Sequence, residues 1–211
     1  MICQRHPHRT RSALVAAATA CLMATAACSG NSAGPQPGQG FGSPPDLRGR
    51  RVVLMPVQEV VGVPGDPDAE LAFTLTDRGR DIDWILNDEI QEVLDRSPAV
   101  QTRTRGLPVG VFTQAQVERI GDPLYGELRR IAALVDADAI LLPVRLSYEA
   151  NEAEEGSTPK ARFTTALIEP RSGRVVWFGI EEGGDFAASD PRALASAAEA
   201  LANTLLWYVG D

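Results

Sequence analysis

The stretch that decides the fold spans residues 137–185 and reads ADAILLPVRLSYE (137–149) and, after a polar loop, ARFTTALIEPRSGRVVWFGIEEGGD (161–185). Its first part alternates apolar and polar residues from Ile140 to Glu149, the period-two pattern of a half-buried strand with one apolar face. Because Pro143 has no N–H to donate to a ladder, we expect this strand at a sheet edge or with a bulge at the proline, and not at the sheet centre.

Two further strands follow, at residues 161–169 and 174–181. The connecting Pro170-Arg171-Ser172-Gly173 combines a proline that presets φ with a glycine that accepts positive φ, which predicts a short antiparallel hairpin. The third strand carries apolar residues on both faces, so we expect it inside the sheet with helices packed on it.

The amino terminus has the pattern of a secretory signal peptide. Residues 1–12 carry three arginines and no acidic residue, and residues 13–27 form an apolar run that ends before Cys28. That run is shorter than the roughly 20 residues that span a bilayer as a helix. We therefore expect residues 1–27 to be removed.

The residues Thr25-Ala26-Ala27-Cys28 resemble a bacterial lipobox, in which a cysteine after small residues is acylated and becomes the first residue of the mature protein. The resemblance implies lipid attachment at Cys28. Thr25 stands where leucine is usual, and Cys21, which also follows small residues, is a second candidate. Ordinary cleavage after Ala26 or Ala27, giving a soluble secreted protein, is the alternative.

Removal of the leader also removes most residues that carry chemistry. The cysteines are Cys3, Cys21 and Cys28, and the histidines are His6 and His8. A chain that begins at Cys28 has no histidine and no thiol pair, which excludes a disulfide framework, Ser-His-Asp and Cys-His sites and histidine-ligated zinc. We expect no catalytic residues, no metal and no cofactor.

The charge of the mature chain is strongly negative. The leader contains three of the 20 cationic residues and none of the 28 acidic ones, so the remaining chain has a net charge of about −11. This charge repels phosphate backbones, which excludes nucleic acid as a partner, and it argues against binding to an anionic membrane surface.

Residues 28–51 are rich in Gly, Pro, Ser and Gln, which predicts a lipid-anchored disordered linker. Ser29 is not aspartate. By resemblance to lipoproteins of two-membrane bacteria, this favours the periplasmic side of the outer membrane, or the outer face of the cytoplasmic membrane in a cell with one membrane. Residues 52–211 are predicted to form one domain.

Within this domain the pattern predicts a buried strand at residues 51–57 and a possible strand at 71–76. Helical spacing predicts an amphipathic helix that begins after Asp81 as N-cap and continues to Leu94. A short polar strand is expected at residues 100–104.

Three more helices are expected. Thr113 and Gln116 have the spacing of a capping box for a helix that ends by Gly121. Asp-Pro pairs at Asp122 and Asp190 each predict a cap followed by proline at the first helical position. The predicted class is therefore α+β, with a mixed, largely antiparallel sheet and amphipathic helices packed on it in a single domain.

VVLMPV (52–57), ADAILLPVRLSYE, the hairpin LIEPRSGRVVW (167–177) and the closing Ala/Leu-rich helix together resemble the α/β module of bacterial envelope lipoproteins. The family includes curli-secretion-type lipoproteins, lipoprotein activators of penicillin-binding proteins and the amino-terminal domain of TolB. The resemblance implies a non-enzymatic protein that binds other envelope proteins. The long hairpins with which curli-secretion lipoproteins form a barrel have no counterpart here, because residues 58–80 and 150–160 are short or acidic.

Four local patterns are candidate sites, and each has a simpler structural interpretation. Ser157 and Lys160 have the S-x-x-K spacing of penicillin-recognising enzymes, but Gly156 and Pro159 place them in a loop. Asp66, Asp68 and Glu70 alternate like calcium ligands without the rest of a calcium loop. The remaining two patterns are an acidic loop that could dock a basic partner (Glu149, Glu152, Glu154, Glu155) and a terminal aromatic pair that could form an exposed patch (Trp207, Tyr208).

The sequence thus predicts a lipid-anchored accessory or assembly factor of the cell envelope that acts by tethered protein binding, with its oligomeric state open. A subunit of an outer-membrane secretion channel is one alternative, which predicts ring oligomers. A periplasmic hydrolase that uses carboxylates is another, which predicts a pocket lined by at least two buried acids.

Overall fold

The computed structural model describes residues 40–114, 117–150 and 158–207, and the predicted leader and anchor lie outside these residues. Their sheet has six strands in the order β3-β1-β4-β5-β6, with β2 pairing β4 beyond the end of β1. Strand β1 pairs in parallel with β3 and with β4, and β2 pairs in parallel with β4. The pairs β4–β5 and β5–β6 are antiparallel. The strands are β1 Arg51–Leu54, β2 Glu59–Val61, β3 Asp83–Ile85, β4 Ala139–Glu149, β5 Lys160–Glu169 and β6 Arg174–Glu182.

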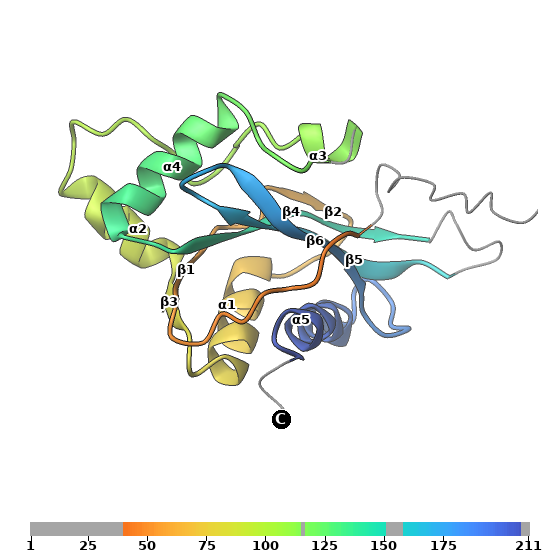
Figure 1. Cartoon of the computed structure of the whole chain (residues 1–211). Helices are drawn as coiled ribbons and strands as arrows, with labels where there is room; N and C mark the ends of the chain where they lie inside the picture. The colour runs from red at the N-terminus through yellow and green to blue at the C-terminus, as the bar shows by residue number, and fades with distance from the viewer. Residues whose placement is uncertain (1–39, 115–116, 151–157, 208–211) are drawn as a thin grey trace, which may run out of the picture. The chain divides into compact units, whose positions relative to one another are not determined.

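Helices cover both faces of this sheet (Figure 1). They are α1 Pro67–Arg78, α2 Asn87–Asp95, α3 Val111–Gln114, α4 Leu124–Val135 and α5 Pro191–Leu205. Helices α1 and α5 enclose one core with the sheet, and α2, α3 and α4 enclose the other. The predicted α+β class with a mixed sheet is confirmed.

Strand β4 lies in the centre of the sheet, so the expectation that Pro143 excludes a central position was wrong. The predicted bulge is present, since the register shifts between Pro143 and Arg145. Within the bulge Pro143 still accepts a hydrogen bond, from the Gln58 N–H at 3.0 Å. The bulge moves Leu146 to the α1/α5 core while Val144 stays in the α2/α4 core. Leu141, before the bulge, also lies in the α1/α5 core, so both faces of β4 are apolar rather than one.

Strand β6 is the last strand in the order, so the expectation that it lies inside the sheet was wrong. Both of its faces are nevertheless buried, with Trp177 in the α1/α5 core and Phe178 in the α2/α4 core. Isolated bridges to Phe41 and Arg119 cover part of its outer edge. Its apolar pattern correctly indicated that both faces are covered. An edge strand can be covered on both faces too, so the pattern did not show the position of the strand in the sheet.

Residues 71–76 belong to α1 and not to a strand. Asp66 caps this helix by accepting hydrogen bonds from the Asp68 and Ala69 N–H groups at 3.2 and 3.1 Å, and Pro67 occupies the first turn. This is the Asp-Pro signal that also precedes α5, where Asp190 caps in the same way. Leu71 and Leu75 are one helical turn apart. Over so short a run, this helical spacing cannot be told from the alternation of a strand.

The segment after Asp81 begins with β3 and becomes helical only at Asn87, so Asp81 is not an N-cap. Its carbonyl instead accepts a hydrogen bond from the Gly49 N–H at 2.7 Å. Residues 100–104 form no strand. Pairing of β3 with β1 is a long-range contact that helical spacing does not encode.

Helix α3 begins at Val111, so Thr113 lies inside it and donates its hydroxyl to the Gly110 carbonyl rather than capping. The helix ends at Gln114 instead of near Gly121, and Gln116 lies outside the described residues. The helices predicted after Asp122 and Asp190 are present as α4 and α5. The predicted cap at Asp122 was wrong, because Pro123 is the N-cap of α4, and Asp122 instead accepts a hydrogen bond from the Gly126 N–H at 3.0 Å. Both helices have buried apolar faces, which include Leu124, Leu128, Ile131 and Val135 in α4, and Leu194, Ala198, Leu201 and Leu205 in α5.

Part of the predicted linker packs on the domain. Leu47 is fully buried in the α1/α5 core, and Phe41 bridges Phe178 of β6. Residues 40–50 are therefore part of the fold, which two isolated apolar residues in a Gly/Pro-rich stretch did not reveal. The remainder of the linker, residues 28–39, stays a prediction.

We predict that Leu47→Ala lowers the free energy of unfolding by about 2–4 kcal/mol, because it leaves a cavity in the core. Phe73→Ala is the matched control, since Phe73 is 70% exposed on α1, and it should change the value by less than about 0.5 kcal/mol. Urea unfolding of both variants measures the difference. Equal stabilities would show that the amino-terminal segment does not belong to the folded unit.

Candidate functional site

The strand order predicts where a ligand would bind if this were an α/β enzyme. The chain leaves the carboxyl end of β1 towards α1 on one face, and it leaves β3 towards α2 on the other face. Adjacent parallel strands whose connections diverge in this way open a crevice at their carboxyl ends, where open α/β sheets bind ligands.

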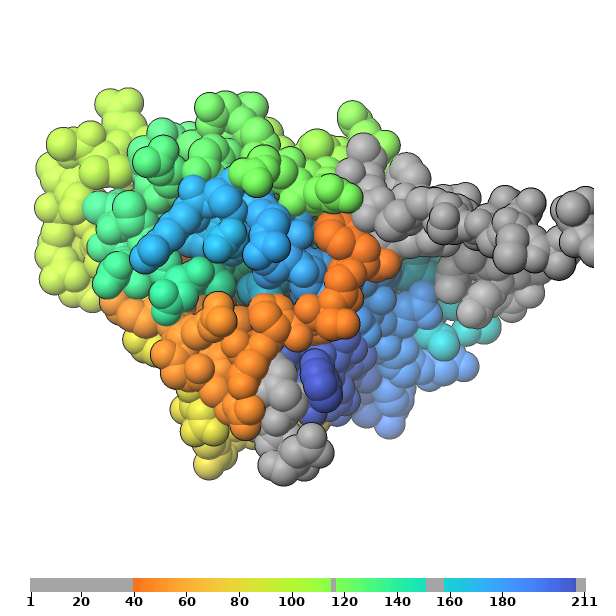
Figure 2. Space-filling model, in the orientation of Figure 1, coloured from red at the N-terminus to blue at the C-terminus, as the bar shows by residue number. Residues whose placement is uncertain are grey.

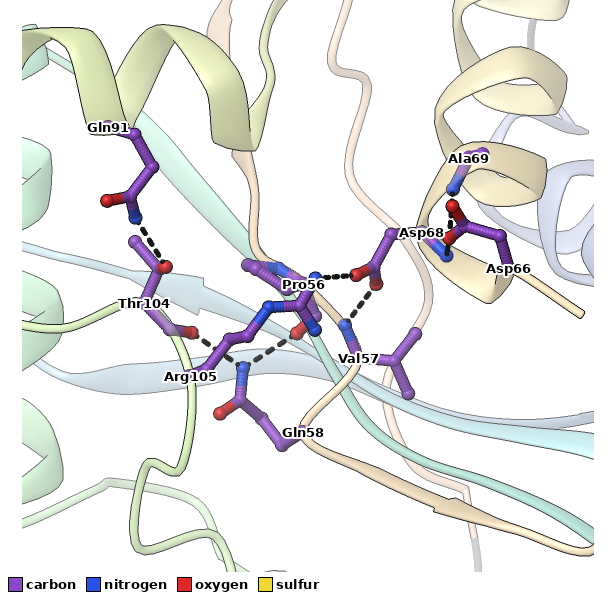
Figure 3. A network of polar contacts seen from close by, with 9 residues as sticks. All are labelled: Pro56, Val57, Gln58, Asp66, Asp68, Ala69, Gln91, Thr104 and Arg105. Carbon is purple, nitrogen blue, oxygen red and sulfur yellow. Dashed lines mark hydrogen bonds and ion pairs between the residues drawn. The ribbon is translucent and has the colours of Figure 1, made fainter.

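In this chain the crevice is filled by the loop that contains Thr104 and Arg105 (Figure 3). The Gln58 amide, just after β1, donates to the carbonyls of Pro56 and Thr104 at 2.7 and 2.9 Å, and its oxygen accepts from the Leu107 N–H at 3.0 Å. From α2, Gln91 donates to the Thr104 hydroxyl at 2.8 Å. Thr104 is buried, so the loop closes the crevice with satisfied polar groups.

The neighbouring carboxylates have structural roles here. Asp68 accepts a hydrogen bond from the Val57 N–H at 2.7 Å and forms an ion pair with Arg105. Asp66 caps α1, and Glu70 lies in its first turn. Among the residues that the structure describes, no group of His, Cys, Asp and Glu could hold a metal ion. Asp68 therefore holds the loop in place, and Asp66 caps the helix.

We predict that Gln58→Ala lowers the free energy of unfolding by about 1–3 kcal/mol, because the Leu107 N–H and two carbonyls lose their partner. Gln101→Ala, an exposed position in the same loop, should change it by less than about 0.5 kcal/mol. Thermal unfolding followed by circular dichroism measures both. A null effect at Gln58 would mean that water replaces its contacts and that the crevice is accessible.

An open groove of about 630 Å³ lies elsewhere, between the amino-terminal segment and the β5–β6 hairpin. In Figure 2 the amino-terminal segment, in orange, lies directly below the hairpin, in blue. The walls of the groove come from residues 41–50, from residues 118–119 and from the adjoining ends of β4, β5 and β6. Its apolar lining residues are Phe41, Pro45, Leu47, Ala139, Leu167, Ile168, Val175 and Val176.

The charged rim of this groove is balanced, with three arginines and three acidic residues. Glu169 faces Arg174 at 3.7 Å and accepts a hydrogen bond from the Ser172 hydroxyl at 2.5 Å. Asp138 accepts from the Arg51 N–H at 3.0 Å. The other rim charges are Arg50, Glu118 and Arg119, all exposed. An apolar floor with an exposed, mixed rim suits a polypeptide better than a small charged substrate.

The buried polar residues in the described part of the chain are Thr74, Thr104, Ser147 and Thr165, and none is a carboxylate. Glu181 on β6 is half-buried, and desolvation raises its pKa above the usual 4.5, opposed by a hydrogen bond from Thr204. The groove carboxylates Glu118 and Asp138 are exposed. These acids do not form the pair of buried carboxyl groups that a hydrolase would use.

We predict that Glu181→Gln raises the free energy of unfolding at pH 7 by up to about 1 kcal/mol. The folded state binds the Glu181 proton more tightly than the unfolded state, so wild-type stability falls as pH rises from about 4.5 through the raised pKa. The gain should vanish below pH 4. Glu182→Gln is the control, because it removes the ion pair with Arg162 at 2.6 Å and should not stabilise.

The residues singled out in the sequence are not brought together. Cys28, Cys21, Ser157 and the acidic residues 152–155 lie outside the described residues. Lys160 lies in β5 opposite Glu149 of β4, within a strand pair and not in a catalytic loop. Trp207 is 61% exposed at the end of α5, whereas Tyr208 is outside the described residues. The helices of the described residues include none that is long and apolar enough to cross a bilayer.

The groove itself was missed in the sequence. Its residues come from five separate segments, and the contribution of Phe41 and Leu47 was assigned to a disordered linker. The one available signal was that these are the large apolar residues of residues 29–50.

The solved structures that resemble this chain include several envelope lipoproteins of low sequence identity. No protein-family model and no curated protein matches the chain. Among solved structures, the C-terminal domain of LpoB from Salmonella enterica is 13% identical, with a TM-score of 0.44 over 66% of this chain and 86% of that one. PelC from Paraburkholderia phytofirmans, a dodecamer, is 17% identical, with a TM-score of 0.39 over 82% and 96%.

Lipoprotein GNA1162 from Neisseria meningitidis is 11% identical, with a TM-score of 0.38 over 77% of this chain and 97% of that one. With identities this low and TM-scores below 0.5, no functional conclusion about this chain follows from these matches.

Proposed function

We propose that this protein is a lipid-anchored accessory factor of the cell envelope that binds an extended segment of another envelope protein in the groove beside β6 and catalyses no reaction itself. The observation that carries the proposal is that the amino-terminal segment, which continues towards the predicted anchor, also forms one wall of the groove. The tether and the binding surface are thus parts of the same stretch of chain.

The anchor in this proposal is the acyl chain on Cys28, and residues 28–39 are the free part of the tether. A Gly/Pro-rich chain of this length has an r.m.s. span of about 19 Å. Such a tether keeps the domain close to one membrane and raises its effective concentration near other proteins there. The residue after Cys28 is serine, which supports the periplasmic face of the outer membrane in a two-membrane cell.

Two features of the site support binding rather than catalysis. The crevice at the ends of β1 and β3, where an α/β enzyme would place its ligand, is filled by the hydrogen bonds of Gln58 and Thr104. The open groove combines an apolar floor with exposed charges, as in protein-binding surfaces. Its nearly neutral rim also avoids the repulsion that the acidic remainder of the domain imposes on anionic partners.

Metabolic labelling with a palmitate analogue tests the anchor. We expect label on the wild type, full loss of label in Cys28→Ser and retention of label in Cys21→Ser, because only Cys28→Ser removes the acylated thiol. Fractionation should release Cys28→Ser from the membranes. Label that is lost in Cys21→Ser and kept in Cys28→Ser would move the anchor, and label on neither would remove it.

Site-specific photocrosslinking in intact cells tests the groove. A photoreactive amino acid at Ser43, which is exposed in the groove, should give a discrete crosslinked protein. The control at Ser189, an exposed serine beside α5, should not. Val176→Arg places a cation on the apolar floor and should reduce the Ser43 product at least about tenfold, whereas Val111→Arg on α3 should leave it unchanged.

The binding proposal fails if the Ser43 and Ser189 probes give the same products, or if Val176→Arg has no effect although the variant folds. If the crosslinks formed only between copies of this chain, in a series of bands that ends at the size of a closed ring, the result would instead indicate a channel subunit.

A further inference from the structure

The outer edge of β6 is occupied by two short segments of the same chain. At one end, Val175 donates its N–H to the Glu118 carbonyl at 2.9 Å, and the Gly173 carbonyl accepts from the Ile120 N–H at 2.8 Å. Further along, Phe41 and Phe178 exchange both backbone hydrogen bonds, at 2.8 and 3.0 Å. Because β6 is the last strand of the order, this edge has no neighbouring strand of the sheet to pair with.

The contact at Phe41 is one residue long. Gly40 and Gly42 on either side are exposed. A Cβ atom on Gly42 would lie 2.7 Å from the Val176 carbonyl oxygen, and its φ is +77°, so only glycine lets the chain approach and leave the strand here. The Phe41 ring stacks on Phe178 with centroids 5.9 Å apart.

The segment is held much more firmly at its other end. Leu47 is fully buried, the Gly49 N–H donates to the Asp81 carbonyl at 2.7 Å, and the Arg50 N–H donates to the Leu47 carbonyl at 3.0 Å. Residues 41–46 therefore form an arm fixed at Leu47 and attached at its tip by a half-buried ring and two hydrogen bonds. Short contacts of this kind open without global unfolding.

An opened arm exposes a template for strand addition. The N–H and C=O groups of Phe178 would lack partners, and the Phe178 ring would lose the ring stacked on it, while its other ring neighbour, Phe112 at 5.8 Å, stays in place. Exposed strand edges bind extended peptides through backbone hydrogen bonds, with specificity from alternate side chains. The Gly-Phe-Gly sequence of the arm indicates that an aromatic residue between two small residues fits the edge at Phe178.

We propose that the β6 edge at Phe178 is a strand-addition site that Phe41 occupies in cis, and that an extended segment of a partner protein with an aromatic residue between small residues occupies in trans. This inference rests on the proposed function for the nature of the ligand. It adds a consequence for reach: displacement of the arm frees residues 40–46, so the tether then extends to Leu47 and partner binding lets the domain move further from the membrane.

A peptide that copies the arm tests the site without knowledge of the partner. The labelled peptide GQGFGSPPD, residues 38–46, is titrated against the mature wild-type chain and against Phe41→Ala. We expect the Phe41→Ala protein to bind it at least about tenfold more tightly, because no internal ring competes for the edge. A peptide with alanine in place of its phenylalanine should bind to neither protein.

Two controls keep the result interpretable. Unfolding temperatures establish that Phe41→Ala is folded, and Phe41→Leu, which keeps part of the ring contact, should give an intermediate affinity. Hydrogen exchange of the Phe178 amide should be faster in Phe41→Ala than in the wild type and slow again when the peptide is added. These readouts report on the edge itself and not on general stability.

The proposal is overturned if folded Phe41→Ala binds no peptide, or if both proteins bind it equally. It is also overturned if the wild type forms a concentration-dependent dimer that Phe41→Ala does not form, since a second copy then fills the edge. Displacement of the arm carries Ser43 away from β6, so the groove is also probed from Arg174, which is exposed on β6 and stays in place. Peptide binding together with failed crosslinking at both Ser43 and Arg174 would leave the edge proven and remove the proposed function, so the two failures are distinguishable.

Discussion

The bulge between Pro143 and Arg145 is the feature on which the remaining structure depends. It lets one strand contain a proline and still lie in the centre of the sheet, paired with β1 and β2 along one edge and with β5 along the other. It also changes which face successive side chains point to, so that β4 contributes Val144 to one core and Leu146 to the other. Both helical layers need this strand between them.

The central position of β4 has a consequence for function. With β1 between β4 and β3, and with connections that leave on opposite faces, the fold has the crevice in which α/β proteins bind ligands. Here the chain fills that crevice with its own loop, held by Gln58 and Thr104. The open groove lies instead at the β6 edge of the sheet, where β6 has no neighbouring strand and the amino-terminal segment crosses its edge.

This arrangement joins two properties that the sequence presents as separate. The linker and the domain were expected to be independent, one disordered and one folded. Leu47 and Phe41 instead attach the end of the linker to the sheet, one by complete burial and the other by a single bridge. Any force or ligand that acts on Phe41 therefore acts on the proposed binding surface and on the length of the proposed tether together.

The sequence by itself determined the class of the fold, the hairpin of β5 and β6, and helices α4 and α5, because each depends on local signals: alternation, a Pro-to-Gly turn, and the Asp-Pro pairs at Asp122 and Asp190. It also determined the net charge, whereas removal of the leader, with both histidines, stays a prediction. The helix over residues 71–76 also has a local signal, the Asp66-Pro67 cap, which the apparent alternation of residues 71–76 obscured. Only the tertiary structure decided that residues 83–85 pair with β1, that β4 is central and β6 is the edge, and where the groove lies. Those features rest on contacts between segments distant in sequence, where the free energy of burial outweighs local preference, and no local pattern records which distant partner a strand will meet.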